Sequence, residues 1–244
     1  MNKDNLKNLI NKFMLVFPPI LTFILIFSFF IKDTKIRGIF LGYEDGLAEN
    51  LTNIFLFIAI IINLISIFSS RVKTKFEIFY LIILTLGCIY FLGEEMSWGQ
   101  HIFKWKASHE WRDINIQKET NFHNLKGFYG KFFSRIPRAC LSAFILIISI
   151  FIPLIQIIFK NIKIQSNIIL AKPNFYIISG YCLAITMIFR RFKPLLKDLY
   201  DKGIIKFNSF AHAFNQTAEI NEFCIAMFLL FYIYSIYIYL KERN

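Results

Sequence analysis

The chain contains long blocks that are rich in Ile, Leu and Phe and poor in charge. One of them, residues 139–159, has no charged side chain. About 20 apolar residues in a helix cross the roughly 30 Å hydrocarbon layer of a bilayer. The composition agrees, because 56% of the residues are hydrophobic and only 18% are charged, whereas soluble domains have about 25% charged residues. Backbone groups in lipid must pair with one another, so such blocks predict an integral membrane protein built from helices.

Six segments have, or nearly have, the length of a membrane span. We therefore predict an all-α, polytopic transmembrane helix bundle of about six spans, with residues 1–244 forming a single integral membrane domain. The fifth segment is the shortest, because Lys172 and Pro173 leave few apolar residues before Arg190. The predicted spans are 13–31, 51–69, 76–93, 138–159, 174–189 and 218–240, and the longest polar connection is 94–137.

The charge distribution favours a lipid environment and excludes several soluble functions. The net charge is +12, but the basic residues flank apolar blocks instead of gathering on one soluble module, which favours anionic headgroups over nucleic acid as partners. Neither a P-loop nor a GxGxxG motif occurs, so nucleotide chemistry is not indicated. The four cysteines lie in apolar blocks without a CxxC pair. We expect a multi-pass protein of the bacterial cytoplasmic membrane.

The acidic residues are distributed unevenly between the two ends of the predicted bundle. If every segment crosses the membrane, the connections after the first, third and fifth spans share one face. That face receives most of the 16 acidic residues and all four histidines. Many of these acids sit at helix ends, where a carboxylate is costly unless it has a partner. The distribution of Lys and Arg leaves open which side of the membrane this face occupies.

The stretch GEEMSWGQHIF, residues 93–103, follows the third predicted span directly. If the helix continues past Gly93, then Glu94, Ser97 and His101 share one helix face, because their spacing is i, i+3, i+7. A carboxylate and an imidazole on one face can bind a metal together, and Glu95 or Ser97 could then transfer protons. The alternative is that the two glutamates end the helix and are simply solvated.

A second polar group lies in NIQKETNFHNLKG, residues 115–127. In an extended segment Gln117, Glu119, Asn121 and His123 point to the same side. The amides of Asn121 and Asn124 flank His123 and suit an imidazole or a substrate hydroxyl. The alternative is an Asn-rich polar loop without a specific role.

A third group lies in AHAFNQTAEINEF, residues 211–223, where His212, Asn215, Glu219 and Glu222 are spaced as one helical stripe. Glu219 and Glu222 enter the last apolar block, where an unpaired charge is costly. A metal, a basic side chain such as Arg190 or Arg191, or a proton must neutralise them. The alternative to a functional site is a structural Arg–Glu pair.

A fourth group lies in GYEDGLAENL, residues 42–51. Asp45 can cap the second span, and Glu49 follows one turn later. Capping accounts for Asp45 but does not require Glu44 or Glu49, so we predict that Glu49 contributes to substrate binding.

Four of these motifs together resemble a known family. EDGLAE (44–49), GEEMSWGQ (93–100), NFHNL (121–125) and AEINEF (218–223) are similar to a family of uncharacterised polytopic bacterial membrane proteins with an E-D-G-x-x-E, G-E-E-x-S-W-G-Q and N-x-H-N layout. The resemblance covers nearly the whole chain and implies a fold. A fainter similarity connects the chain to the alkaline ceramidase and progestin-receptor-like superfamily of seven-helix zinc hydrolases. The chain departs from that superfamily in its six predicted spans and in the lack of a late H-x-x-x-H pair.

These observations predict a membrane-embedded site at one interface, with metal-dependent hydrolysis or transfer on a lipid or lipid-linked substrate as the candidate reaction. The expected cofactor is zinc or another divalent metal. The alternatives are a non-enzymatic transporter or channel, or a subunit of an envelope assembly. The predicted catalytic residues are Glu95 and Ser97, the metal ligands are Glu94, His101, His123, Glu219 and Glu222, and the substrate-binding residues are Glu49, Gln100, Gln117, Asn121 and Asn124.

Overall fold

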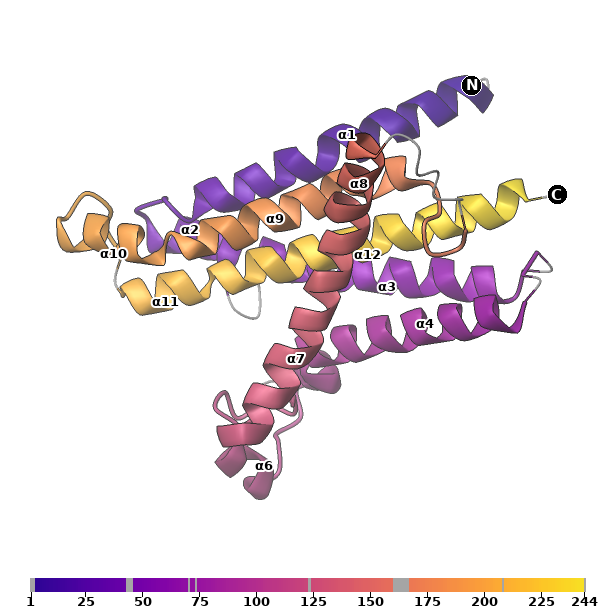
Figure 1. Cartoon of the computed structure of the whole chain (residues 1–244). Helices are drawn as coiled ribbons and strands as arrows, with labels where there is room; N and C mark the ends of the chain where they lie inside the picture. The colour runs from indigo at the N-terminus through magenta and orange to yellow at the C-terminus, as the bar shows by residue number, and fades with distance from the viewer. Residues whose placement is uncertain are drawn as a thin grey trace.

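The computed structural model describes residues 3–42, 46–69, 71–72, 74–122, 124–159, 167–207 and 209–243, and within these ranges the protein is helical without a β-strand. Five segments of helix are long and apolar enough to cross a membrane (Figure 1). This confirms the predicted all-α polytopic bundle. The five candidate spans are Leu9–Ser28, Leu47–Ile67, Lys75–Glu95, Ile136–Ile158 and Phe210–Glu242.

The long helices follow the apolar blocks closely. They are α1 (Lys3–Ser28), α3 (Leu47–Ile67), α4 (Lys75–Glu95), α7 (Gly127–Leu146), α9 (Ile177–Arg191) and α12 (Thr217–Glu242). Short helices connect them, namely α2 (Thr34–Leu41), α5 (Gln100–Phe103), α6 (His109–Ile114), α8 (Ile152–Ile158), α10 (Lys193–Asp201) and α11 (Phe210–Asn215).

The fifth predicted span is the one that differs from the expectation. Residues 174–189 form most of α9, which has 15 residues and is therefore about 22 Å long at 1.5 Å per residue. This is shorter than the roughly 30 Å hydrocarbon layer. A 3₁₀ turn at Pro173–Phe175 precedes α9. The bundle thus consists of five helices of spanning length and one shorter helix packed among them.

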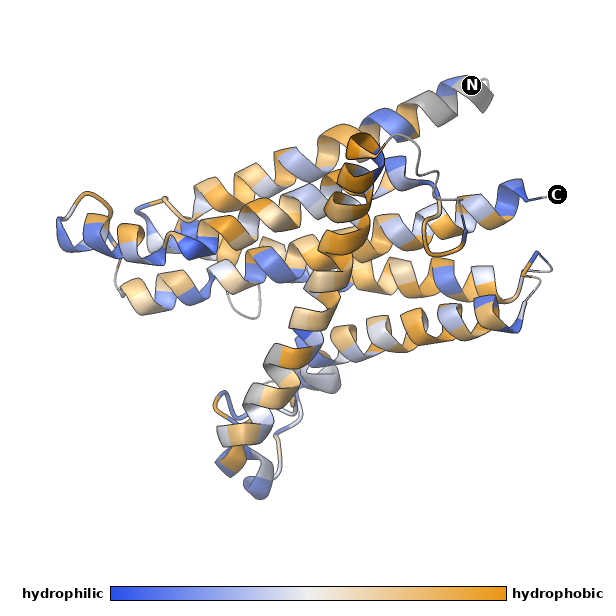
Figure 2. Cartoon of the chain, in the orientation of Figure 1, coloured by the Kyte–Doolittle hydropathy of each residue, from blue (hydrophilic) through white to orange (hydrophobic). Residues whose placement is uncertain are grey.

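The centre of the bundle is α12. It packs against α3, α9 and α1, and most of its residues from Ile220 to Leu240 are buried. A helix that is apolar around its whole circumference is expected at such a position. Figure 2 shows the same pattern over the molecule, since hydrophobic residues follow the long helices and hydrophilic residues gather at their ends.

The connections alternate between the two ends of the bundle, as the sequence predicted. α2, the end of α4, and α10 with α11 lie toward one end, whereas both chain termini lie toward the other (Figure 1). The end with the termini is held by ion pairs and hydrogen bonds. Arg243 contacts the buried carboxylate of Glu77 at 2.5 Å, and Arg71 donates to the carbonyl of Lys241 at 2.7 Å.

The α7–α8 segment crosses the other long helices at a steep angle in Figure 1. A π-helical turn at Ile147–Phe151 joins α7 to α8. Near this turn the segment packs very closely on α9, because a Cβ atom added to Gly180 would lie only 2.3 Å from Ser149. The oblique course of α7 determines which surfaces of α4 and α12 remain open near the acid-rich end.

Candidate functional site

The GEEMSWGQ motif forms a sharp turn at the end of α4. The helix ends at Glu95, and the backbone then turns left-handed, with φ values of 47° at Ser97, 54° at Trp98 and 97° at Gly99. Left-handed conformations are strained for residues other than glycine. The turn folds the Trp98 ring back onto α4, where a Cβ atom on Gly93 would lie 2.8 Å from the ring. Gly93 therefore provides the space that this fold-back needs.

Glu94 holds the turn in place. One oxygen of its carboxylate accepts a hydrogen bond from the Trp98 indole at 2.7 Å, and the other accepts one from the Phe122 backbone amide at 2.9 Å. Glu94 is buried, and hydrogen bonds to a buried carboxylate are among the stronger ones in proteins. These contacts fix residues 96–122 against α4. The role of Glu94 as a metal ligand stays a prediction.

Ser97 belongs to the same hydrogen-bond network. Its hydroxyl donates to Glu119 at 2.8 Å and accepts from the Asn121 amide at 3.0 Å. The Asn121 amide also donates to Glu119 at 2.6 Å, and the Asn115 amide donates to the Asn121 carbonyl at 2.8 Å. This network gives the 115–124 segment a defined shape and orients its amide side chains.

Gln100 anchors the segment at a second point. Its side-chain oxygen accepts hydrogen bonds from the backbone amide of Thr120 at 2.9 Å and from the Thr120 hydroxyl at 3.1 Å. The Thr120 hydroxyl also lies 2.6 Å from the Ser97 carbonyl. Gln100 and Ser97 thus hold Thr120, and with it the 115–124 segment, in place.

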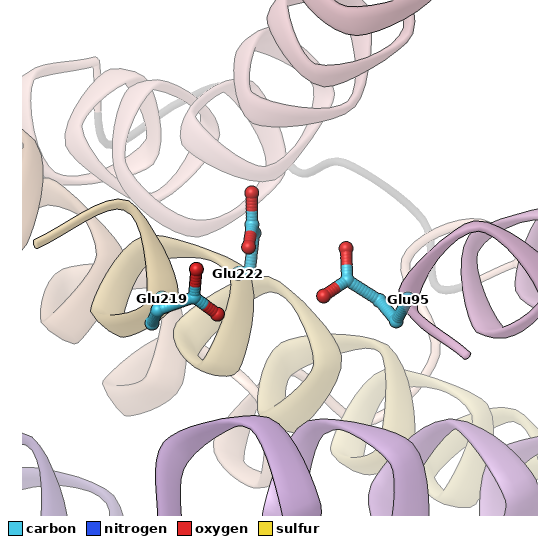
Figure 3. A group of neighbouring side chains, drawn as sticks. All are labelled: Glu95, Glu219 and Glu222. Carbon is cyan, nitrogen blue, oxygen red and sulfur yellow. The ribbon is translucent and has the colours of Figure 1, made fainter. Parts of the chain in front are cut away.

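Three carboxylates converge opposite this segment. Glu95 at the end of α4 faces Glu219 and Glu222 in the first turns of α12 (Figure 3), and one oxygen from each lies within 4.8 Å of the other two. Carboxylates this close repel one another unless a cation or a proton neutralises them.

Two arginines partly balance the three acids. Arg138 of α7 makes an ion pair of 2.5 Å with Glu222, and it lies within electrostatic range of Glu95 and Glu219. Arg190 at the end of α9 acts on Glu219 in the same way. The α7 and α9 helices therefore bring positive charge to the acids of α4 and α12.

A polar cavity of about 320 Å³ encloses these groups. This size is at the lower end of the range of small-molecule sites, about 300–1,000 Å³. The carboxylates and guanidinium groups face a wall of four amide side chains, and the cavity lies where the long apolar helices end. Its charged lining residues are Glu49, Glu95, Glu119, Glu219, Glu222, Arg138 and Arg190, and its amide residues are Gln117, Asn121, Asn124 and Asn215.

The cavity brings together most of the side chains that were predicted from the sequence. Those that line it are Glu49, Glu95, Gln117, Asn121, Asn124, Glu219 and Glu222. Glu94, Ser97 and Gln100 are not among the lining residues and hold the adjoining turn instead. His101 lies on α5, and the structure describes its backbone but not its side chain. His123 lies outside the described residues. Their predicted role as ligands stays a prediction.

Sequence reasoning missed one charged residue of the cavity, Arg138. Arg138 carries a detectable signal, because it lies two residues inside the helical segment Ile136–Ile158 that is apolar enough to span a membrane, and charged residues at such positions usually have a partner or a function. Glu119 was expected on the same side of its segment as Gln117 and Asn121, and all three line the cavity, although no role was assigned to Glu119. Of the two arginines proposed as partners for α12, Arg190 lines the cavity and Arg191 is exposed.

Comparison of the chain with protein-family models, curated proteins and solved structures gives no match.

The contacts of Glu94 lead to a first prediction. In Glu94→Gln the amide has one oxygen, so it can accept only one of the two hydrogen bonds from Trp98 and Phe122, and we expect a loss of about 1–3 kcal/mol in the stability of this turn. The variant should show altered Trp fluorescence and faster proteolysis between residues 96 and 122. Glu110→Gln, which changes an exposed residue of α6, is the matched control. Loss of metal binding with an intact turn would instead make Glu94 a ligand.

Proposed function

We propose that this protein is an integral membrane enzyme that binds one divalent metal ion on Glu95, Glu219 and Glu222 and hydrolyses or transfers a group of a lipid or lipid-linked substrate. The observation that carries the proposal is the convergence of three carboxylates from two helices in a polar cavity at the end of a bundle of apolar helices. A bacterial cytoplasmic membrane is the proposed location.

The donor set favours a hard cation. Carboxylate oxygens suit Mg²⁺, Mn²⁺ and Ca²⁺ better than the softer metals that prefer imidazole or thiolate. Two oxygens that bind one such ion at about 2.0–2.6 Å can be at most about 4–5 Å apart, which is compatible with the limit of 4.8 Å between the three carboxylates. The ion pair with Arg138 uses one oxygen of Glu222, and a carboxylate has a second oxygen for a metal.

The charge balance of the cavity also supports a bound cation. Glu49, Glu95, Glu219 and Glu222 line it together with Arg138 and Arg190, so negative groups exceed positive ones even before Glu119 is counted. A site at membrane depth stabilises such an excess poorly. One divalent ion would offset the two-charge excess of Glu49, Glu95, Glu219 and Glu222 over the two arginines.

The remaining walls of the cavity suit a polar substrate group. Gln117, Asn121, Asn124 and Asn215 offer amide donors and acceptors, and the guanidinium groups of Arg138 and Arg190 can hold developing negative charge or a phosphate. A bound divalent ion would activate water or polarise a carbonyl or phosphoryl oxygen. Glu119, oriented by Ser97 and Asn121, is placed to accept a proton at the cavity wall.

The arrangement supports an enzyme more strongly than a transporter. A transport path requires polar groups that continue through the membrane. Beyond Glu222, the described part of α12 continues as buried Phe223, Cys224, Ile225, Ala226 and Met227. The charged cavity thus ends about one turn into this helix.

Metal binding tests the first half of the proposal. The purified protein is titrated with Mn²⁺ and the free ion is measured by electron paramagnetic resonance. We expect one Mn²⁺ per chain, and we expect Glu95→Gln and Glu219→Gln each to weaken binding by at least about tenfold, since each removes a charged ligand. Glu110→Gln should bind as the wild type does. Absence of binding, or equal binding in all variants, would refute the metal site.

Turnover tests the second half. Protein in nanodiscs made from a bacterial polar lipid extract is incubated with Mn²⁺ or with EDTA, and the lipids are analysed by mass spectrometry. We expect one lipid class to decrease and its product to appear only with Mn²⁺ and only in the wild type. If no lipid changes although Mn²⁺ is bound, the enzymatic function is wrong and a binding or structural role replaces it.

A further inference from the structure

A second, apolar groove of about 330 Å³ lies between α4 and α7, directly beside the acid cavity. The charged residues of the groove are Glu94, Glu95 and Arg138, and Glu95 and Arg138 also line the cavity, so the two spaces adjoin at these two residues. The remaining lining is mostly hydrophobic and comes from three helices. Its main apolar residues are Tyr90, Phe91, Phe133, Leu141 and Ile225.

The lining changes character along α4. Gly87 lies eight residues before Glu95, a separation of about 12 Å along the helix. Between them Tyr90 and Phe91 present aromatic surface, and the charged groups are met only at the end of the helix. The groove therefore has the polarity profile of an amphiphile with one charged end and one hydrocarbon end.

Gly87 faces open space in the groove. A Cβ atom added to this glycine would have no atom within 4 Å, although the residue lies inside a long helix where alanine would be more favourable by about 1 kcal/mol. The groove lies between α4 and α7, and its lining at this level is apolar. Such a lining suits a hydrocarbon chain better than a polar ligand.

We propose that the groove between α4 and α7 binds one hydrocarbon chain of a membrane lipid whose polar group occupies the acid cavity. This deepens the function proposed above, because it makes the substrate a lipid that enters from the side of the bundle between these two helices. A chain gains little by moving from the bilayer into an equally apolar groove. The groove therefore selects and orients the lipid, and the polar cavity supplies the affinity.

The test uses a sixteen-carbon fatty acid that carries a diazirine, supplied to the expressing cells so that it enters all their lipids. The protein is purified into nanodiscs of these lipids, irradiated, digested and analysed by mass spectrometry. We expect adducts at residues 87–91 and 133–141 well above those on outward-facing residues such as Phe57 and Phe79, which are exposed. The mass of each adduct identifies the polar group of the bound lipid.

Two matched glycine variants decide whether the groove is the binding site. Gly87→Leu fills the groove and should reduce its adducts to the level of the outward-facing residues. Gly38→Leu in α2, whose added Cβ also meets no atom within 4 Å, should leave them unchanged. Unselective adducts in the wild type, or adducts that persist at the wild-type level in Gly87→Leu, would refute the proposal.

The result of the crosslinking experiment can be distinguished from the results of the tests of metal binding and turnover. The experiment is run in EDTA as well as with Mn²⁺, and we expect groove adducts in both. Adducts without Mn²⁺ binding or turnover would support the groove and refute the enzyme, whereas turnover without Gly87-dependent adducts would refute the groove alone. If Gly87→Leu does not fold, as judged by its thermal unfolding, Leu141→Trp fills the same groove from α7.

Discussion

Replacing Glu95 and Glu219 together by glutamine is expected to stabilise the metal-free protein and to abolish its Mn²⁺ binding. At an effective dielectric constant of about 20, two unit charges 4.8 Å apart, the upper limit for these carboxylates, would repel by roughly 3 kcal/mol. Arg138, Arg190 or a proton taken up by one of the carboxylates offsets part of this repulsion. We therefore expect a gain of about 2 kcal/mol, or roughly 4–8 °C in the melting temperature of a chain of this length. Thermal unfolding in EDTA measures the gain, and Mn²⁺ titration measures the loss.

The opposite signs of the two effects make this prediction specific. Residues that only support the fold lose stability when they are changed, whereas residues that serve a function at the expense of the fold gain it. Glu77→Gln is the matched control, because Glu77 is buried and forms an ion pair with Arg243, and we expect this variant to lose stability. A double variant that unfolds earlier than the wild type would show that Glu95 and Glu219 are structural.

Most of the fold follows from the length and spacing of the apolar blocks. A run of about 20 apolar residues has few alternatives to a spanning helix, and alternate connections must then return to the same end. The steep course of α7 was not predictable in this way. It depends on the close contact between Gly180 and Ser149 and on the π-helical turn beside it, and neither has a recognisable pattern in hydropathy.

The sequence could predict which segments meet at the site, but not how their side chains are arranged there. The glutamates of the second, third and last spans were expected at one interface, and Glu49, Glu95 and the two acids of α12 line one cavity there. The expected stripe of Glu94, Ser97 and His101 does not form, because the helix ends at Glu95 and the next residues are left-handed. Residues spaced by three and four positions share one face only as long as the helix continues.

The adjacent residues Glu94 and Glu95 illustrate the same limit. Neighbouring side chains on a helix point in directions about 100° apart, so they cannot share one site easily. The structure turns Glu94 toward Trp98 and Phe122 and turns Glu95 toward α12 (Figure 3). The sequence GEE offers no means of deciding which of the two faces the cavity, because that choice depends on where α12 packs.

The second large effect is expected from Arg138→Met, which should lower stability and strengthen metal binding at the same time. The change removes the partner of Glu222, whose side chain is 6% exposed, while that of Arg138 is 36% exposed. Breaking a fully buried pair costs about 3–5 kcal/mol, so we expect about 2–3 kcal/mol for this partly exposed one. A cation no longer competes with the guanidinium group, and Mn²⁺ affinity should rise by about tenfold, or about 1.4 kcal/mol.

Two further measurements separate these effects from a general loss of structure. Mn²⁺ should raise the melting temperature of Arg138→Met more than that of the wild type, because the ion restores the missing positive charge and binds only the folded state. Adding Glu222→Gln to Arg138→Met should recover most of the lost stability in EDTA, since the carboxylate left without its partner is then removed. If Arg138→Met binds Mn²⁺ more weakly than the wild type, Arg138 does not compete with the metal and the three carboxylates do not form one cation site.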